Sequence, residues 1–200
     1  MNAILLDIGN VVMRFDFAPV AAHLAERCPD PKSRAPLEHI APLKRDLEIG
    51  NIDGETFLRE ASRQLRYRGT TEELRRVWEN VNTPHEPMWD TIDRLRDRYR
   101  LCLLSDTSDI HRDALFRDHT IFQHFDGGVY SFEMRCRKPD PAMFRAAIEQ
   151  LKLVPTETLY VDDRAPNVEG GARAGFRSLL YDPEDHDRFL REARALGIDL

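Results

Sequence analysis

Four short polar segments of this 200-residue chain carry side chains that could do chemistry together. Asp7 follows the apolar run AILL, and Ser105 follows the apolar run LCLL. The pair Asp162 and Asp163 follows TLYV, and Lys138 lies in the segment RCRKPDP. A carboxylate, a hydroxyl, a cation and two adjacent acids are sufficient for phosphoryl transfer through a covalent aspartyl intermediate that a metal ion assists.

The elements that must position these side chains are apolar runs typical of strands buried on both faces of a parallel sheet. Five such runs occur, at Ala3–Leu6, Arg100–Leu104, Gly128–Phe132, Thr158–Val161 and Arg177–Tyr181. Helical patterns lie between most of them, which predicts an α/β fold with a Rossmann-like, doubly wound parallel sheet. Ligands bind beyond the carboxyl ends of such strands, so we expect the four polar segments to converge there.

The interval from about Asp16 to Pro87 interrupts this alternation. It contains no convincing strand, so we interpret it as a helical insertion. Its amphipathic stretches are Val20–Arg27, Leu37–Leu47, Gly54–Tyr67 and Thr71–Val81. We therefore predict an α/β core of residues 1–15 and 88–200 and an inserted helical cap of residues 16–87. The insertion leaves the sheet after the first polar segment and returns before the second, so it should cover the site.

The segment after the first strand places Gly9 and Asn10 behind Asp7. Small or turn-tolerant residues let backbone amides approach a bound anion, while the carboxylate attacks phosphorus. An aspartate after an apolar strand also fits an ordinary turn or helix cap, so this segment alone leaves both interpretations open.

The segment after the second strand combines Ser105 with Asp106 at the start of a predicted helix. Side-chain oxygens in this position often cap the helix that follows. A helix N-terminus also directs free N–H groups and positive partial charge outward, so the same residues suit a phosphate.

Lys138 stands out because arginine is the dominant basic residue of this chain. A lysine there is compatible with the need for a compact point charge on a phosphoryl oxygen. A solvated loop charge is the alternative when the segment is considered by itself.

Asp162 and Asp163 form the strongest single signal, because adjacent like charges repel unless a cation or hydrogen-bond donors compensate them. Hard oxygen ligands at the end of a strand suit Mg²⁺, which also pairs with substrate phosphate. A surface turn is the alternative. Asn167 lies close behind, where its amide could orient Lys138 or an aspartate, or cap the next helix.

Composition restricts the partners of the protein. The formal net charge of -6 disfavours general binding to nucleic acid or to an anionic membrane. No run approaches the roughly 18 apolar residues of a membrane span, and no signal peptide is recognisable, so we expect a cytoplasmic protein. Cys28, Cys102 and Cys136 lack metal-type spacing and are expected to be reduced thiols. The sequence leaves the oligomeric state open.

Taken in order, the segments DIGNVV, LLSDT, RKPDP and YVDDRAPN resemble the motifs of the haloacid dehalogenase-like (HAD) hydrolase superfamily. The resemblance covers essentially the whole chain and points to the subgroup with a small helical cap after the first motif. The opening D-x-G-N-V is similar to that of bacterial glucose-1-phosphate phosphatases. The resemblance implies a Mg²⁺-dependent phosphatase that acts on a small phosphorylated metabolite, such as a sugar phosphate.

The resemblance also implies a role for each motif residue. Asp7 would be the nucleophile, Ser105 would hold a phosphoryl oxygen, and Lys138 would neutralise charge on both. The implied Mg²⁺ ligands are Asp7, the backbone carbonyl of Gly9, Asp162 and Asp163. The expected substrate-binding positions are Ile8, Gly9, Asn10, Ser105, Asp106 and Lys138.

One position departs from the pattern of the superfamily. Most of its phosphatases carry a second aspartate two residues after the nucleophile, where it protonates the leaving oxygen and later activates water, whereas this chain has Gly9. Loss of a general acid or base lowers rates by about 10²- to 10⁴-fold. Asp16 and a metal-associated water are the first candidates to replace it.

Other functions stay open at this stage. In a 2-haloacid dehalogenase the same aspartate attacks carbon without a metal, and a catalytically weak phosphometabolite-binding or regulatory protein would explain Gly9. Transfer of the phosphoryl group to a sugar, as in a mutase, is a further alternative. Phe15, Arg45, Glu48 and Trp78 are cap candidates for substrate contact, without a prediction of which faces inward.

Overall fold

The computed structural model describes residues 1–28 and 36–200. The described part contains a five-stranded, fully parallel sheet with the strand order β5-β4-β1-β6-β7. These strands are β1 (Ala3–Leu6), β4 (Arg100–Ser105), β5 (Gly128–Tyr130), β6 (Thr158–Asp162) and β7 (Arg177–Leu180). Each of the five predicted strands is present, and the predicted fold class is confirmed.

The first strand lies at the centre of the sheet, and the strand order reverses beside it. Leu6 of β1 pairs with Leu103 of β4 on one side and with Val161 of β6 on the other. The residues that follow Leu6, Leu103 and Val161 therefore leave the sheet at the same edge. In open α/β sheets this reversal point is where ligands bind, because the connections diverge there to opposite faces.

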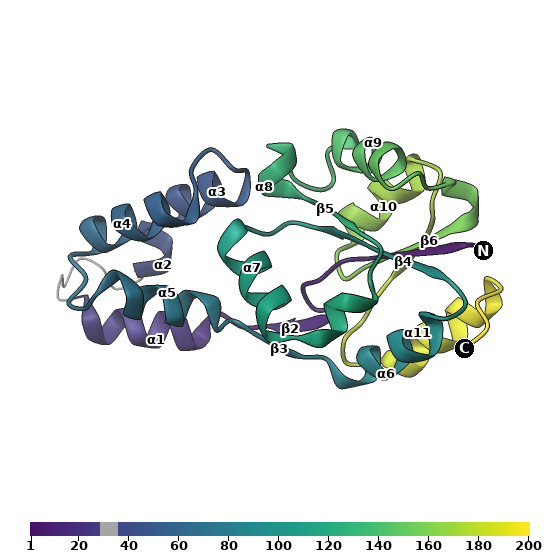
Figure 1. Ribbon diagram of the computed structural model, residues 1–200, viewed down its shortest axis with the longest axis horizontal. Coiled ribbons are helices and arrows are strands. Elements are labelled where there is room, and N and C mark those ends of the chain that lie inside the picture. The colour runs from purple at the N-terminus through teal and green to yellow at the C-terminus, as the bar shows by residue number, and fades with distance from the viewer. Residues whose placement is uncertain (29–35) are drawn as a thin grey trace.

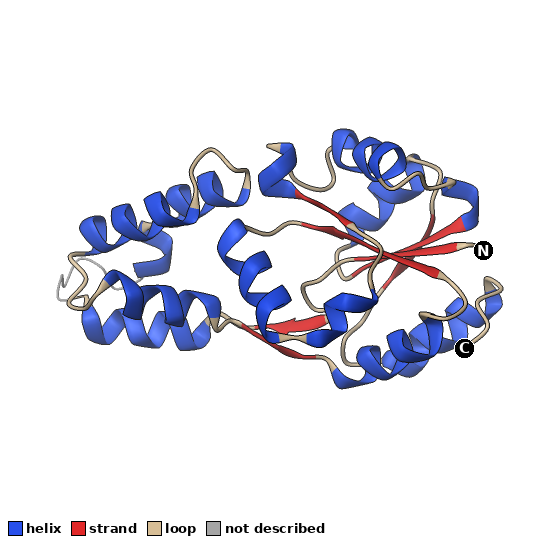
Figure 2. Ribbon diagram, in the orientation of Figure 1, coloured by secondary structure: helices blue, strands red, loops and turns tan. Residues whose placement is uncertain are grey.

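Helices cover both faces of the sheet (Figure 2). One face packs against α6 (Glu86–Leu95), α7 (Asp109–Asp118), the 3₁₀ helix η1 (Thr120–His124) and α11 (His186–Ala195). The other face packs against α9 (Pro141–Gln150), with α10 (Ala165–Arg173) beside it. The short helix α8 (Ser131–Met134) and the 3₁₀ helix η2 (Pro155–Glu157) complete the connections.

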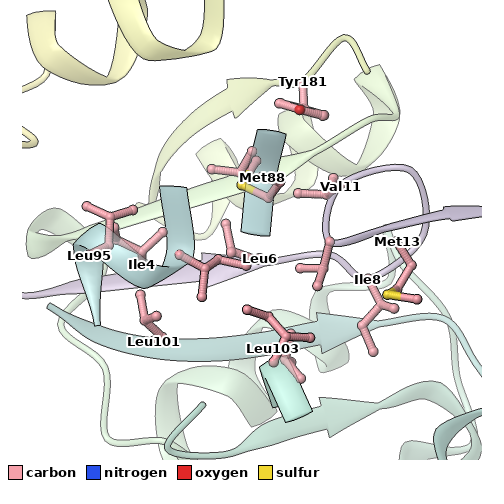
Figure 3. Packing of buried hydrophobic residues seen from close by; sticks show 14 of the residues in the cluster. Ile4, Leu6, Ile8, Val11, Met13, Met88, Leu95, Leu101, Leu103 and Tyr181 are labelled. Atoms are coloured by element: carbon pink, nitrogen blue, oxygen red, sulfur yellow. The ribbon is translucent and has the colours of Figure 1, made fainter. Parts of the chain in front are cut away.

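Alternation along β1 explains why its residues are all apolar. Leu6 points into a cluster with Met88 and Leu95 of α6, which Figure 3 displays. Leu5 points the opposite way and packs with Phe144 of α9. Successive side chains of a strand face opposite sides, so a strand covered on both faces has no position for a polar residue.

A separate group of helices lies beyond the carboxyl ends of the strands, on the left in Figure 1. It consists of α1 (Ala18–Arg27), α2 (Pro36–His39), α3 (Ala41–Glu48), α4 (Gly54–Leu65) and α5 (Thr71–Glu79). The group has its own apolar cluster, in which Trp78 and Phe57 are fully buried. Local signals start two of the helices: Asp53 caps α4 by accepting from the Thr56 N–H, and Thr70 with Glu73 forms a capping box at α5.

Two details of this region differ from the sequence prediction. The interval 16–87 contains a strand, β3 (Asn82–Pro84), which pairs antiparallel with β2 (Met13–Phe15). Three residues are too short for a recognisable alternation, and the strand exists because β2 supplies its partner. The single helix predicted at Leu37–Leu47 is two helices, because the chain breaks at Ile40 and restarts with Pro42 in the first turn of α3. The domain boundaries at residues 16 and 87 remain a prediction.

None of the helices in the described parts of the chain is long and apolar enough to cross a membrane. The three cysteines carry free thiols; Cys28 and Cys102 are buried, and Cys136 is partly exposed. Burial raises the pKa of the Cys102 thiol to about 11, which keeps it protonated and unreactive.

A chain of hydrogen bonds fastens the two short strands to the core. Arg14 Nε of β2 donates to Nδ1 of His85 (3.1 Å), so the proton of this imidazole lies on Nε2 and is donated to the Tyr181 hydroxyl (2.6 Å). Tyr181 in turn lies 2.8 Å from Nδ1 of His186, whose Nε2 lies 2.9 Å from the Thr91 hydroxyl. The bond from Arg14 needs a neutral His85, because the ring nitrogen that accepts it cannot carry a proton. Burial accordingly lowers the pKa of His85 to about 4.

We predict that His85 makes the fold sensitive to acid. The pKa of His85 is lowered from 6.5 to about 4. Between these pH values its imidazole therefore binds a proton in the unfolded chain but not in the folded protein. The free energy of unfolding of the wild type should therefore fall, relative to that of His85→Gln, by about 1.4 kcal/mol for each pH unit as the pH is lowered from 6.5 to 4. Urea unfolding of both proteins at pH 7, 6 and 5 measures the difference. Replacement of the exposed His39 by Gln is the control, and a difference for His85→Gln that stays constant with pH contradicts the prediction.

Candidate active site

Asp7 directly follows the central strand, and its N–H donates to the Val161 carbonyl (3.0 Å). Its Oδ1 accepts from the N–H of Ile8 (2.7 Å) and lies 2.9 Å from Nζ of Lys138. Burial raises the pKa of Asp7 to about 7, although the charge of Lys138 opposes this shift. The side chain keeps 11% of its surface exposed, so the carboxylate is accessible from one direction.

Lys138 is a fully enclosed cation. Its side chain is 1% exposed, and Nζ contacts Asp7 (2.9 Å), Asp162 Oδ2 (2.7 Å) and the Leu104 carbonyl (2.7 Å). These contacts match the three protons of the ammonium group. Burial acts to lower the pKa of Lys138, but the two carboxylates outweigh it and raise the pKa to about 12. The charge is therefore permanent at physiological pH.

Asp162 is completely buried and accepts four hydrogen bonds. Oδ2 accepts from Lys138 Nζ (2.7 Å) and from the Tyr160 hydroxyl (2.6 Å). Oδ1 accepts from the Arg164 N–H (2.9 Å) and from Asn167 Nδ2 (2.9 Å). Burial acts to raise the pKa of Asp162, but Lys138 and these donors hold it below its usual value. These four hydrogen bonds use the acceptor sites of both carboxylate oxygens, so Asp162 is suited to hold Lys138 in position.

Asp163 is less buried and has fewer donors. Its Oδ2 accepts from Nδ2 of Asn10 (3.0 Å), a residue whose φ of 55° lies in the left-handed region that asparagine tolerates. Burial raises the pKa of Asp163. Asp7, Asp162 and Asp163 each place one carboxylate oxygen so that these atoms lie within 4.8 Å of one another.

This cluster suits a divalent cation in charge and in donor type. Three carboxylates and the single ammonium of Lys138 leave two negative charges, and hard carboxylate oxygens are the ligands that Mg²⁺ prefers. Asn167 adds a second indication, because its Oδ1 is buried without a partner among the described residues. Buried acceptors are normally satisfied. This oxygen is available to a donor such as a water molecule carried by an ion.

The neighbouring segments complete the edge of the sheet. Ser105 ends β4 and is 2% exposed, and it lines a hollow of about 40 Å³ together with Ile8 and Gly9. The carboxylate of Asp106 accepts from the Lys138 N–H (3.0 Å) and from Arg137 Nε (3.2 Å), which holds the lysine segment in place. Beside Gly9 there is open space, because a Cβ atom built there would meet nothing within 4 Å.

A cavity of about 180 Å³ opens above these groups. Of the predicted site residues, the cavity is lined by Asp7, Gly9, Asn10, Asp106, Lys138 and Asp163. Ile8 and Ser105 lie in the adjoining hollow, and Asp162 lies beneath Lys138. The structure thus brings all the predicted positions together at one edge of the sheet. Their individual roles stay predictions.

The candidate replacement for the general acid does not lie in this cavity. Asp16 is exposed, and its Oδ1 accepts from the Ala18 N–H (2.8 Å) at the start of α1. Of the four cap candidates, Phe15 and Glu48 line the cavity. Arg45 is exposed, and Trp78 is fully buried in the apolar cluster of the helices.

Sequence reasoning missed several residues of the site. Lys44 and Arg137 line the cavity, and Tyr160 supports Asp162 from beneath. The signal for Tyr160 was present, since residues two apart on a strand share a face and a buried hydroxyl needs a partner. For Lys44 the sequence offers only an i,i+4 pair with Glu48, which is usually a surface feature.

Comparison with known proteins identifies the family. The model of haloacid dehalogenase-like hydrolases matches residues 1–175, and the chain belongs to this family. It is therefore a HAD-like hydrolase, as the motifs indicated.

Individual relatives are distant but cover the whole fold. A D-ribitol-5-phosphate phosphatase of Bacteroides thetaiotaomicron is 25% identical over 190 residues, which are 91% of each chain. A phosphorylated carbohydrates phosphatase of Thermotoga maritima is 23% identical over 90% of this chain and 84% of its own. The crystal structure of a HAD family enzyme of Bacteroides thetaiotaomicron, in complex with magnesium and inorganic phosphate, superposes with a TM-score of 0.81. That protein is 20% identical, and the match covers 92% of this chain and 95% of the other.

We predict that the nucleophile position destabilises the metal-free protein. The pKa of Asp7 is raised from 3.8 to about 7, so between these values the unfolded chain has released a proton that the folded protein retains. In chelator, the wild type should lose stability relative to Asp7→Asn by about 1.4 kcal/mol per pH unit as the pH rises through this range. Urea unfolding at pH 5 and pH 8 measures this difference. Asp16→Asn is the exposed control, and equal stability of Asp7→Asn and wild type at pH 8 disagrees with the prediction.

Proposed function

We propose that this HAD-like hydrolase is a Mg²⁺-dependent phosphatase that cleaves a small phosphorylated carbohydrate through an aspartyl-phosphate intermediate. The observation that carries the proposal is the cluster of Asp7, Asp162 and Asp163, whose carboxylate oxygens lie within 4.8 Å of one another beside the buried ammonium of Lys138. Asp7 and Asp163 of this cluster line the cavity. The family membership and the printed names of two relatives, both phosphatases of phosphorylated carbohydrates, support it.

In the proposed mechanism, Asp7 attacks phosphorus with the carboxylate oxygen that faces the cavity. Lys138 stabilises the carboxylate before attack and the phosphoryl oxygens during transfer, because its charge is fixed and preorganised. The hydroxyl of Ser105 and the backbone N–H groups of Ile8, Gly9 and Asp106 would hold the remaining phosphoryl oxygens. Water then cleaves the aspartyl phosphate and regenerates Asp7.

The metal site of the proposal consists of Asp7, Asp163 and the carbonyl of Gly9. Bound Mg²⁺ would neutralise charge on the transferring phosphoryl group and help to align it. Asp162 belongs to the predicted ligand set as well, but its four hydrogen bonds favour a positioning role toward Lys138. Asn167 would accept a hydrogen bond from a water on the ion.

The helical segment of residues 16–87 acts as the cap in this proposal, and residues 1–15 and 88–200 form the catalytic core. The apolar cluster of the helical segment, which is separate from those of the core, supports this division. The pairing of β2 with β3, where the chain leaves and re-enters the core, supports it as well. Lys44 and Glu48 of α3 reach the cavity from the cap, so the cap supplies part of the wall around the substrate.

Proton transfer to the leaving oxygen is the unusual step. Gly9 supplies no acid, and Asp16 does not line the cavity; its Oδ1 accepts from the Ala18 N–H at the start of α1. We therefore assign this step to water in the site, which favours substrates whose leaving oxygen needs little protonation. An anomeric phosphate leaves more easily than an alkyl phosphate, so sugar 1-phosphates fit this requirement.

The dehalogenase alternative is less well supported. A carboxylate that attacks carbon needs no metal, and the accumulation of Asp162 and Asp163 beside Asp7 would then only add repulsion. Halide release from 2-haloacids in the presence of chelator would reverse this judgement.

The central test is phosphate release by wild type and Asp7→Asn, measured with a panel of phosphorylated carbohydrates in Mg²⁺ and in chelator. We expect release by the wild type only in Mg²⁺, and a loss of at least about 10⁴-fold in the variant, since it lacks the nucleophile. Asp16→Asn should retain wild-type turnover. Equal turnover by Asp7→Asn refutes the mechanism, and ligand binding without product identifies a binding protein instead.

A second test restores the missing acid. Gly9→Asp places a carboxyl group in space that is open in the structure, where it can protonate the leaving oxygen. We expect kcat on an alkyl phosphate to rise about 10- to 100-fold, less than the full effect of an evolved general acid. Gly9→Asn has the same shape without the proton and should give no increase. A rise with both variants would show that the side chain acts through packing alone.

A further inference from the structure

Four charged residues form a continuous ladder across the mouth of the cavity, in the order Lys44, Glu48, Arg137, Asp106. Lys44 and Glu48 pair along α3, Arg137 Nη1 lies 2.9 Å from Glu48 Oε2, and Arg137 Nε lies 3.2 Å from Asp106 Oδ2. All four line the cavity above Asp7. The ladder thus joins the cap to the core at the point where the non-reacting part of a substrate must lie.

The ladder carries no net charge. Its two cations are matched by two carboxylates, so it has no surplus positive charge for a second phosphate or a carboxylate of the substrate. Two other cations line the cavity: Lys138 is paired with Asp7 and Asp162, and Arg164 is exposed and follows Asp162 and Asp163 in the sequence. A hydroxyl group is both a donor and an acceptor, so it can bond to Glu48 and to Arg137 without adding charge.

An aromatic side chain provides an apolar surface in the same cavity. Phe15 is 40% exposed, lines both the cavity and the adjoining hollow, and meets Phe17 edge to face with ring centroids 4.9 Å apart. An exposed aromatic beside paired charges suits a molecule with C–H groups on one side and hydroxyl groups on the other. A small carbohydrate or polyol has this character.

The core holds Glu48 in position. The hydroxyl of Ser131 donates to the Glu48 carbonyl (2.6 Å). Two residues later, Gly50 turns with a φ of 66°, and a Cβ atom there would lie 1.9 Å from the Phe132 carbonyl oxygen. The turn is therefore pressed against the core, which fixes where Glu48 enters the cavity. Such preorganisation is needed for selection among similar substrates.

We propose that Glu48, together with Arg137 and Phe15, forms the specificity site for the uncharged, hydroxyl-bearing part of the substrate. This inference rests on the proposed phosphatase function and adds the substrate class: monophosphates of short polyols or sugars, and neither bisphosphates nor phosphorylated carboxylic acids. The cavity of about 180 Å³ agrees with a small substrate, since pockets for drug-sized ligands measure about 300–1,000 Å³.

The test compares kcat/KM of wild type and Glu48→Gln on three monophosphates in Mg²⁺. Ribitol 5-phosphate carries hydroxyl groups, pentyl phosphate has the same number of carbons without them, and 3-phosphoglycerate carries a second anion. We expect Glu48→Gln to lose about 10- to 100-fold on ribitol 5-phosphate, because a charge-assisted hydrogen bond disappears, and to change less than about threefold on pentyl phosphate. In the same variant, the ratio of kcat/KM for ribitol 5-phosphate to kcat/KM for 3-phosphoglycerate should also fall by at least about 10-fold.

Two further variants separate specificity from folding. Glu60→Gln removes an ion-paired carboxylate of α4 that does not line the cavity, and it should leave all three values unchanged. Phe15→Leu replaces an exposed ring and should raise KM for ribitol 5-phosphate more than for 3-phosphoglycerate. An equal loss on all three substrates in Glu48→Gln, or no change in their ratios, overturns the inference. If the wild type releases phosphate from none of the three, the comparison of Glu48→Gln with wild type is made on glucose 1-phosphate. No release by the wild type there refutes the proposed function, and release with an unchanged kcat/KM in Glu48→Gln overturns this inference alone.

Discussion

The active site depends on one buried ion cluster, in which the ammonium of Lys138 lies between the carboxylates of Asp7 and Asp162. Its third contact, the Leu104 carbonyl, belongs to β4, so the cluster joins three neighbouring strands and the segment that carries the lysine. Replacement of Asp162 would leave the buried charge of Lys138 without its fully buried partner, and breaking a buried ion pair in this way typically costs about 3–5 kcal/mol. The contacts that place Lys138 beside Asp7 are therefore a condition for the fold around them.

This cluster leaves the site electrostatically incomplete without a cation. Asp7 and Asp163 both have raised pKa values because they are buried, and Asn167 keeps a buried oxygen without a partner among the described residues. Each feature is unfavourable for stability and becomes favourable once a hard cation with its water molecules is present. The local departures from good packing and pairing are thus concentrated where the chemistry is proposed, as is common for functional sites.

The cavity has two halves of different origin. In the proposed mechanism the core supplies the groups around the phosphate, while the helical segment adds Lys44 and Glu48 to the cavity wall, and Arg137 connects the two through an ion pair. Reaction chemistry and substrate choice can therefore change independently, since the substitution of a cap residue leaves Lys138 and Asp162 in place. Gly9 is the exception in this mechanism, because it supplies no acid and also leaves open space beside the proposed substrate position.

The five strands of the sheet and the polar residues at their ends could be predicted from the sequence, because a strand buried on both faces is apolar along most of its length and polar residues gather where it ends. Asp7, Ser105 and the acid pair were predicted in this way, whereas Lys138 lies beyond α8 and was predicted from the segment RKPDP; the structure brings all of them to one edge. Other features depend on contacts between segments that are distant in the sequence. The difference between Asp162 and Asp163 arises from donors on three separate segments, and β3 exists because β2 pairs with it. The positions of Glu48 and Arg137 depend on how α3 rests against α8, a contact between segments more than eighty residues apart that leaves no periodicity in the chain.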